Sequence, residues 1–105
     1  MKFKLDDIPA RDVMPGFHGR FIHTDTMTLA YWTTDKGAIL PVHHHPHEQV
    51  VNMLEGELEI TAGGVTHKLR PGDVLVIPGD TVHSGRALTA TKVLDVFNPV
   101  REDYR

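Results

Sequence analysis

Residues 37–56 read GAILPVHHHPHEQVVNMLEG and contain four of the eight histidines in the chain. Successive side chains of a strand face opposite sides, so an extended course puts His43 and His45 on one face and His44 on the other. Gln49 returns to the face of His43 and His45 if the extended course resumes beyond the proline. This stretch therefore predicts a strand-borne group of metal ligands.

A further candidate ligand is His83, which follows PGDTV and stands at the start of another apolar run. Three imidazole nitrogens and one amide oxygen suit a divalent transition metal ion such as Ni, Mn, Fe, Co or Zn. The sequence thus indicates one bound ion. The alternative is a solvent-exposed, histidine-rich loop with adventitious metal affinity, and spacing alone weighs the two equally.

Most of the remaining chain consists of short runs rich in Val, Ile, Leu, Thr and aromatic residues, separated by Gly, Pro and Asp. Such runs are typical of β-strands, and turn residues at nearly every junction favour an antiparallel sandwich or barrel. The expected strands are Arg20–Thr24, Met27–Thr33, Ala38–Val42, Gln49–Leu54, Glu57–Thr61, Val65–Leu69, Val74–Ile77, Val82–Arg86 and Lys92–Phe97. The sequence therefore predicts an all-β fold.

Local signals suggest how some segments connect. Glu55-Gly56 is a hairpin signal, and Gly63-Gly64 marks the next turn. Val74–Ile77 is apolar on both faces, which predicts a strand covered on both sides. The first sixteen residues, MKFKLDDIPARDVMPG, contain two prolines and no sustained helical period, so we expect an irregular lead-in with room for one helical turn.

The composition excludes several classes of protein. With 105 residues, 40% apolar and 24% charged, the chain has the size and balance of one globular domain. It has no cysteine, which excludes disulfides and thiolate chemistry. A net charge of −3 without a basic patch argues against nucleic acid, and no run of about eighteen apolar residues suggests a membrane span. The N-terminal residues lack a signal peptide's apolar stretch, so we expect a cytoplasmic protein.

The stretch KVLDVFNPVREDY, residues 92–104, holds two further candidates. Asp95 shares a strand face with two apolar residues, and burial raises the pKa of a carboxyl group toward a value suited to proton transfer. Arg101 lies where the chain leaves the strand and can fold over the barrel mouth, and a guanidinium grips a carboxylate through two hydrogen bonds. On these residues alone, a purely structural ion pair between Asp95 and Arg101 is the favoured interpretation.

Two motifs in the chain resemble those of the cupin family. The first is carried by Gly37, His43, His45, Gln49 and Gly56, and the second by Gly72, Pro78 and His83. The family usually has Glu in place of Gln49 and Gly in place of Asp80, and often has Asn in place of Ala87. The resemblance implies a double-stranded β-helix, the jelly-roll cupin barrel, with the metal held by His43, His45, Gln49 and His83.

The same resemblance implies one cupin domain over residues 1–105. Its expected parts are a lead-in over about 1–18, a β-barrel over 19–98 and a C-terminal tail over 99–105. Small cupins commonly pair their sheet faces, and Val74–Ile77 and Leu94–Val96 look apolar on both sides. Because covering such faces removes exposed apolar surface, we expect a homodimer.

A closer resemblance covers the chain from about Val13 to Tyr104. The runs HPHEQ, LEGELEI and PGDVLVIPGDTVHSG and the ending LDVFNPVREDY are similar to the pectin-degradation (KdgF-type) cupins, which act on unsaturated uronates. This resemblance implies that Asp95 is the acid–base group and that Arg101 binds the substrate or takes part in catalysis.

The activity implied is the metal-dependent conversion of 4,5-unsaturated monouronates, from pectin or alginate breakdown, to linear keto acids. The substrate is then a sugar acid, and no redox cofactor is needed. Two alternatives stay open. One is another small-molecule cupin enzyme, such as an oxygenase or isomerase, and the other is a non-catalytic cupin that binds a metal and a ligand.

Overall fold

The computed structural model describes all 105 residues and consists almost entirely of β-strands. The strands are β1 (Arg11–Met14), β2 (Phe17–His23), β3 (Thr28–Thr34), β4 (Ile39–His43), β5 (Glu48–Glu55), β6 (Leu58–Ala62), β7 (Val65–Leu69), β8 (Val74–Ile77), β9 (His83–Ala87) and β10 (Thr91–Asn98). Two short 3-10 helices, η1 (Leu5–Asp7) and η2 (Glu102–Tyr104), lie near the chain ends. None of the helices is long and apolar enough to cross a membrane.

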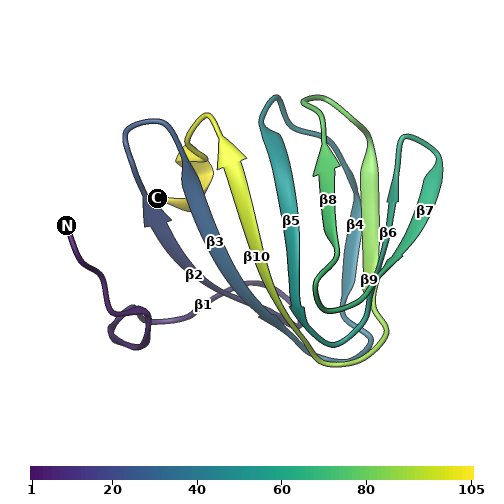
Figure 1. Ribbon diagram of the computed structural model, residues 1–105, viewed down its shortest axis with the longest axis horizontal. Helices are drawn as coiled ribbons and strands as arrows, with labels where there is room; N and C mark the ends of the chain where they lie inside the picture. Colours follow the sequence, from purple (N-terminus) through teal and green to yellow (C-terminus); the bar gives the residue numbers. More distant parts are fainter.

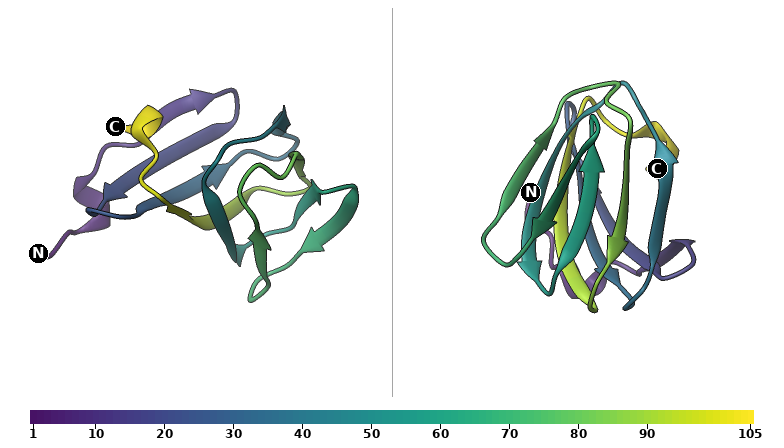
Figure 2. Two further views of the ribbon diagram at one scale, coloured as in Figure 1. Left: turned by 90° about the horizontal axis from the view of Figure 1, so that it is seen from above. Right: turned by 90° about the vertical axis from the view of Figure 1, so that its right-hand side faces the viewer.

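The strands form two antiparallel sheets (Figures 1 and 2). The six-stranded sheet has the order β1-β2-β3-β10-β5-β8, and the four-stranded sheet has the order β4-β9-β6-β7. In the larger sheet β10, near the C-terminus, lies between β3 and β5. Strands distant in sequence thus become neighbours, and the expected all-β jelly-roll is confirmed.

The core lies between the two sheets and follows from strand alternation. Along β3 and β10, buried residues alternate with less buried ones. The buried face of β10 carries Val93 and Phe97, which pack with Trp32 of β3 and Val51 of β5 in one hydrophobic cluster. Side chains two apart share a face, so Asp95 must point into the same interior.

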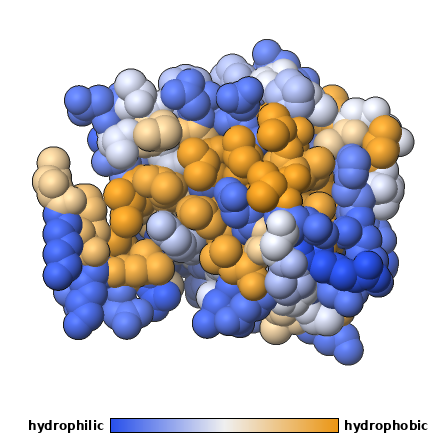
Figure 3. All heavy atoms as spheres, in the orientation of Figure 1, coloured by the Kyte–Doolittle hydropathy of each residue, from blue (hydrophilic) through white to orange (hydrophobic).

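The outer face of the six-stranded sheet is also apolar. One cross-strand row consists of Ile22, Leu29, Val96, Val50 and Val76. In Figure 3 apolar atoms gather across the middle of the view, over the region of β10, β5 and β8 in Figure 1. The expectation that Val74–Ile77 is covered on both sides is wrong for the single chain, because Val74 and Val76 are 59% and 56% exposed.

Eight of the nine expected strands agree with the structure within one residue at each end. The exception is the first, because β2 begins at Phe17 rather than Arg20. The lead-in also contains a strand that the sequence did not indicate, β1, which pairs with β2. No residue of β1 is fully buried, so this strand lacks the apolar alternation by which half-buried strands are recognised.

The expected hairpin at Glu55-Gly56 is wrong. β5 and β6 belong to different sheets, so this turn carries the chain from one sheet to the other. A side chain at Gly56 would approach the Ala90 carbonyl oxygen to 2.1 Å, and the residue has φ +80°. Glycine is therefore required by a corner of the barrel rather than by a hairpin.

Candidate metal centre and adjoining cavity

Three histidines converge between the two sheets. His43 ends β4 and is paired in register with His83, the first residue of β9. His45 lies in the loop that leads into β5. Nitrogen atoms of the three side chains all lie within 4.8 Å of one another, close enough to share one ion. His45 thus joins this group from outside a regular strand, although strand alternation was the reason to expect it there.

A bulge in β4 orients His43 toward this centre. Leu40 pairs with Gly85, whereas His43 pairs with His83, so β4 has one more residue than β9 over this interval. Bulges re-aim the side chains that follow them. The interval contains Pro41, which has no backbone N–H to donate and suits a bulge on the edge strand of the four-stranded sheet.

Backbone carbonyl groups hold all three imidazoles in the orientation that metal binding requires. Each Nδ1 lies within hydrogen-bond distance of a carbonyl oxygen two residues away in sequence. The distances are 2.7 Å from His43 to Pro41, 3.1 Å from His45 to His47 and 2.8 Å from His83 to Thr81. Because a carbonyl oxygen only accepts, each Nδ1 carries the proton and each Nε2 is left with a free lone pair.

Gln49 supplies an oxygen atom beside these nitrogens. Its Oε1 lies 3.1 Å from Nε2 of His45, and the residue is 5% exposed. Nε2 of His83 is buried and has no hydrogen-bond partner. Burial, followed by the positive charges of Arg101 and His83, lowers the pKa of His45 to about 4, and burial also lowers the pKa of His83. These residues fit a divalent transition metal ion bound by three neutral imidazoles and an amide oxygen.

The turn before β9 locks the His45 loop in place. The backbone N–H of Asp80 donates to the carbonyl oxygen of His45 at 2.7 Å. Asp80 has φ 60°, the left-handed conformation that the Gly of the cupin motif would adopt readily. The neighbouring Gly79 lies so close to the loop that a side chain there would approach the Pro46 carbonyl oxygen to 2.4 Å.

Asp95 is a buried carboxyl group beside the histidine cluster. It is 8% exposed, and its Oδ1 has no hydrogen-bond partner. Burial raises the pKa of Asp95 to about 7, while the neighbouring Gln49 and Trp32 side chains and the charge of Arg101 counter part of this rise. A buried carboxyl group with one unpaired oxygen is costly to stability, which is typical of functional sites.

Arg101 is buried at 8% exposure, and its ion-pair partner is Asp103 rather than Asp95. Its Nε and Nη2 donate to the two carboxylate oxygens of Asp103 at 2.9 and 2.7 Å. Its guanidinium carbon also lies 4.8 Å from the ring centre of Phe97 and 4.2 Å from that of Tyr104. The structural ion pair between Asp95 and Arg101 is therefore absent.

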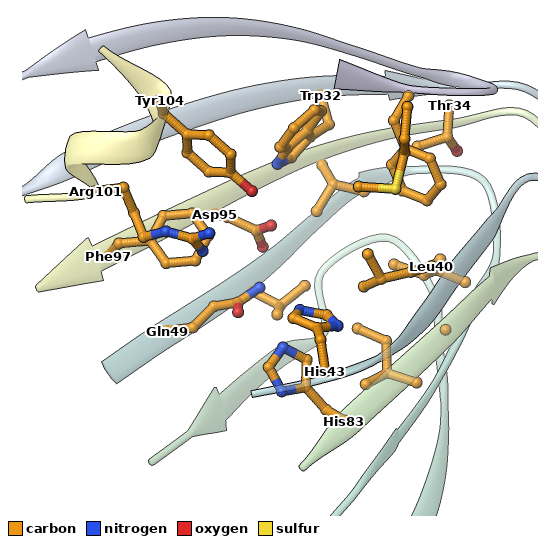
Figure 4. A pocket seen from close by; sticks show the side chains of 17 residues that line it. Trp32, Thr34, Leu40, His43, Gln49, His83, Asp95, Phe97, Arg101 and Tyr104 are labelled. Carbon is orange, nitrogen blue, oxygen red and sulfur yellow. The ribbon is translucent and has the colours of Figure 1, made fainter. Parts of the chain in front are cut away.

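One cavity is lined by Asp95, Arg101, Gln49, His43 and His83. Figure 4 shows Asp95, Gln49 and Arg101 pointing into the same space, with His43 and His83 on its opposite side. Trp32, Phe97 and Tyr104 also line the cavity. Trp32 is 7% exposed and packs edge-on against Phe21 at 5.3 Å between ring centres, so its role is largely in the core.

The other histidines lie outside the cluster. His44 is exposed and lies outside the three-histidine cluster, with its Nδ1 4.0 Å from Oδ1 of Asp80. His47 does not join the three ligating nitrogens, but its Nε2 lies 3.2 Å from the carbonyl oxygen of Val100 and so contacts the segment that carries Arg101. His18 lies between Asp12 and Asp35 on the surface.

The fold and this centre define the class of protein. Residues 30–97 match the family model described as the cupin domain, and the chain belongs to the cupin family. Its structure closely matches that of KdgF from Halomonas sp., with a TM-score of 0.94 and 30% sequence identity over 100% of this chain and 98% of that chain. An RmlC-like cupin from Shewanella frigidimarina gives a TM-score of 0.92 at 28% identity, covering 100% and 95% of the two chains. The predicted cupin resemblance is thereby confirmed.

Among curated proteins, the chain is similar to L-ectoine synthase from Hahella chejuensis, with 36% identity over 61 residues. This alignment covers 56% of the chain and 46% of the synthase, so the chain spans less than half of that relative. Its cupin neighbours thus include enzymes that differ in reaction.

Proposed function

We propose that this cupin converts 4,5-unsaturated monouronates from pectin or alginate breakdown to linear keto acids. The observation that carries the proposal is the buried Asp95 carboxyl group, which has an unpartnered oxygen. Its cavity is also lined by Arg101 and by three of the four candidate metal ligands, His43, Gln49 and His83. The likeness to Halomonas KdgF over nearly its whole length supports the same assignment.

The reaction is an isomerisation. The C1–O5 bond of the ring hemiacetal breaks, and C1 becomes a carbonyl as its hydroxyl loses a proton. The O5 enol then becomes a ketone at C5 as a proton is delivered to C4. Atoms and electrons balance without an oxidant or added water, so the chemistry needs carboxylate binding, oxygen polarisation and proton transfer.

Each requirement has a candidate residue. Arg101 binds the substrate carboxylate through Nη1 and the remaining proton of Nη2, since Asp103 already occupies its Nε edge. Asp95, which is buried and has one unpaired oxygen, moves the proton to C4. His43, His45, Gln49 and His83 would hold the ion, which when bound supplies Lewis acidity toward the sugar oxygens.

Asp95→Asn tests the proposal most directly. The amide has the same shape but cannot carry a proton, so we expect the variant to bind metal normally and to lose about 100- to 10,000-fold in kcat. The assay follows loss of the ultraviolet absorbance of an unsaturated monouronate, after subtraction of spontaneous ring opening. Asp25→Asn, an exposed loop residue outside the cavity, is the matched control.

Two outcomes contradict different steps. Wild-type protein that never exceeds the spontaneous rate with any loaded metal ion rejects the uronate activity. Active wild type with an equally active Asp95→Asn variant leaves the reaction in place but removes Asp95 from proton transfer.

The similarity to ectoine synthases favours a second candidate, another cupin reaction on a small molecule. Metal-loaded protein that leaves uronates unchanged but converts another small acid would establish it. A protein that binds a ligand and converts none would instead be a non-catalytic cupin.

A further inference from the structure

The C-terminal turn forms part of the cavity wall. η2 brings the chain back over the end of the six-stranded sheet (Figure 2). There the ring of Tyr104 packs among three aromatic side chains, two of which, Trp32 and Phe97, are labelled in Figure 4. The ring centres lie 4.7 Å from Phe21, 5.8 Å from Trp32 and 5.8 Å from Phe97. These residues belong to three adjacent strands, so the ring is held by the sheet itself.

The backbone of the turn is held as firmly as the ring. The carbonyl oxygen of Tyr104 accepts a hydrogen bond from the Arg11 side chain and lies 3.3 Å from Nε2 of His23. Further back, the N–H of Arg101 donates to Oγ1 of Thr28 at 2.9 Å. Residues of β1, β2 and β3 thus hold a segment that the sequence alone presents as a polar tail.

In this position the ring face and the hydroxyl group of Tyr104 make different contacts. The face of the ring lies against the guanidinium of Arg101, at 4.2 Å from its central carbon. The hydroxyl group points into the cavity toward Asp95, as Figure 4 shows. Burial raises the pKa of Tyr104, so the hydroxyl keeps its proton and can donate it in a hydrogen bond.

The guanidinium is therefore confined on two sides. Asp103 occupies its Nε edge and the Tyr104 ring covers one of its faces. Arginine loses less freedom on binding a carboxylate when its fork is already oriented. A carboxylate bound there would place the rest of a six-membered sugar ring in the cavity that Tyr104 and Asp95 also line.

We propose that Tyr104 is a substrate-positioning and specificity-determining residue, whose ring fixes Arg101 and whose hydroxyl donates a hydrogen bond to a hydroxyl group of the bound sugar acid. The inference rests on the proposed function only for the class of ligand, a cyclic acid with ring hydroxyls. Tyr104 would then distinguish a cyclic acid with ring hydroxyl groups from one without them.

The test compares two acids that share a ring and a carboxylate but differ in hydroxyl groups, namely galacturonate and tetrahydropyran-2-carboxylate. Their affinities for metal-loaded protein are measured by calorimetry, with no turnover required. Tyr104→Phe should weaken galacturonate binding about five- to tenfold and change tetrahydropyran-2-carboxylate binding by less than about twofold. Tyr104→Leu also frees Arg101 and should weaken both acids.

Tyr31→Phe is the matched control, because Tyr31 lies on the outer face of β3 in the row of Leu94 and should leave both affinities unchanged. Tyr104→Phe that binds galacturonate like wild type overturns the hydroxyl contact, and so does wild type that binds neither acid. Wild type that binds galacturonate but does not convert unsaturated uronates rejects the proposed reaction and leaves the role of Tyr104 standing.

Discussion

Gly79→Ala perturbs the metal centre without changing any candidate ligand. Gly79 has a φ outside the left-handed region, so alanine is acceptable to its own backbone. The obstacle is the Pro46 carbonyl oxygen, 2.4 Å from where the new methyl carbon would lie, whereas ordinary contacts begin near 3.4 Å. The turn and the His45 loop must therefore separate by about 1 Å.

Moving the turn away from the His45 loop lengthens one hydrogen bond. The N–H of Asp80 donates to the carbonyl oxygen of His45 at 2.7 Å, and a 1 Å displacement takes it to about 3.7 Å, beyond hydrogen-bond range. Loss of this bond together with residual overlap costs about 2 kcal/mol. For a domain of this size the melting temperature should fall by about 10 °C. Because His45 moves with its loop, metal affinity should fall about tenfold.

Circular dichroism melting of the metal-free protein measures the first effect, and competition with a chelator measures the second. Gly37→Ala is the control, because Gly37 has φ +84° and no atom within 4 Å of the added methyl group. It should cost about 1 kcal/mol through backbone strain and leave metal affinity unchanged. A Gly79→Ala protein with wild-type melting temperature and wild-type metal affinity would refute the close-approach argument.

Three further predictions concern other parts of the molecule. Protein purified without a histidine tag should contain about one divalent transition metal ion per chain by elemental analysis, and His83→Ala should lose it. Less than about a tenth of an equivalent that added metal does not restore would contradict the site. The apolar outer face should pair two chains, so light scattering should show a dimer and Val76→Glu should give monomers; a wild-type monomer at micromolar concentration would count against pairing. Hydrogen bonds to Asp12 and Asp35 raise the pKa of His18, so its contribution to stability is complete below the unfolded-state value of about 6.5 and is lost as pH rises through the folded-state value. His18→Gln should therefore lower the melting temperature at about pH 5.5 but not at about pH 9, and equal effects at both would show that protonation is irrelevant.

Strand positions could be predicted from the sequence because alternation and turn residues are local signals. Sheet membership could not. Gly63-Gly64 joins two paired strands, whereas Glu55-Gly56, with similar turn chemistry, joins strands of different sheets. At the second turn Gly56 lies close to Ala90, a contact 34 residues away in sequence that no local pattern reports.

In the candidate site, too, some residues could be predicted from the sequence and others could not. The histidines and Gln49 stand out by residue type and spacing, and the structure brings them together. The partner of Arg101 does not stand out, because Asp103 reaches it only through the 3-10 turn of η2. Tyr104 is equally hidden, since its aromatic neighbours come from β2, β3 and β10 and its own sequence surroundings are charged.

The bulge in β4 makes the number of residues between Leu40 and His43 a determinant of metal binding. If the same residues paired with β9 without the bulge, Val42 would lie opposite His83 and His43 would be displaced by one position. A one-residue shift reverses the face of a strand's side chains, so His43 would turn away from the cavity. A relative that lacked either Pro41 or Val42 would need no bulge, because regular pairing from Leu40 would then bring His43 opposite His83. Such a relative would keep the three histidines together, although a motif search with fixed spacing would not detect it.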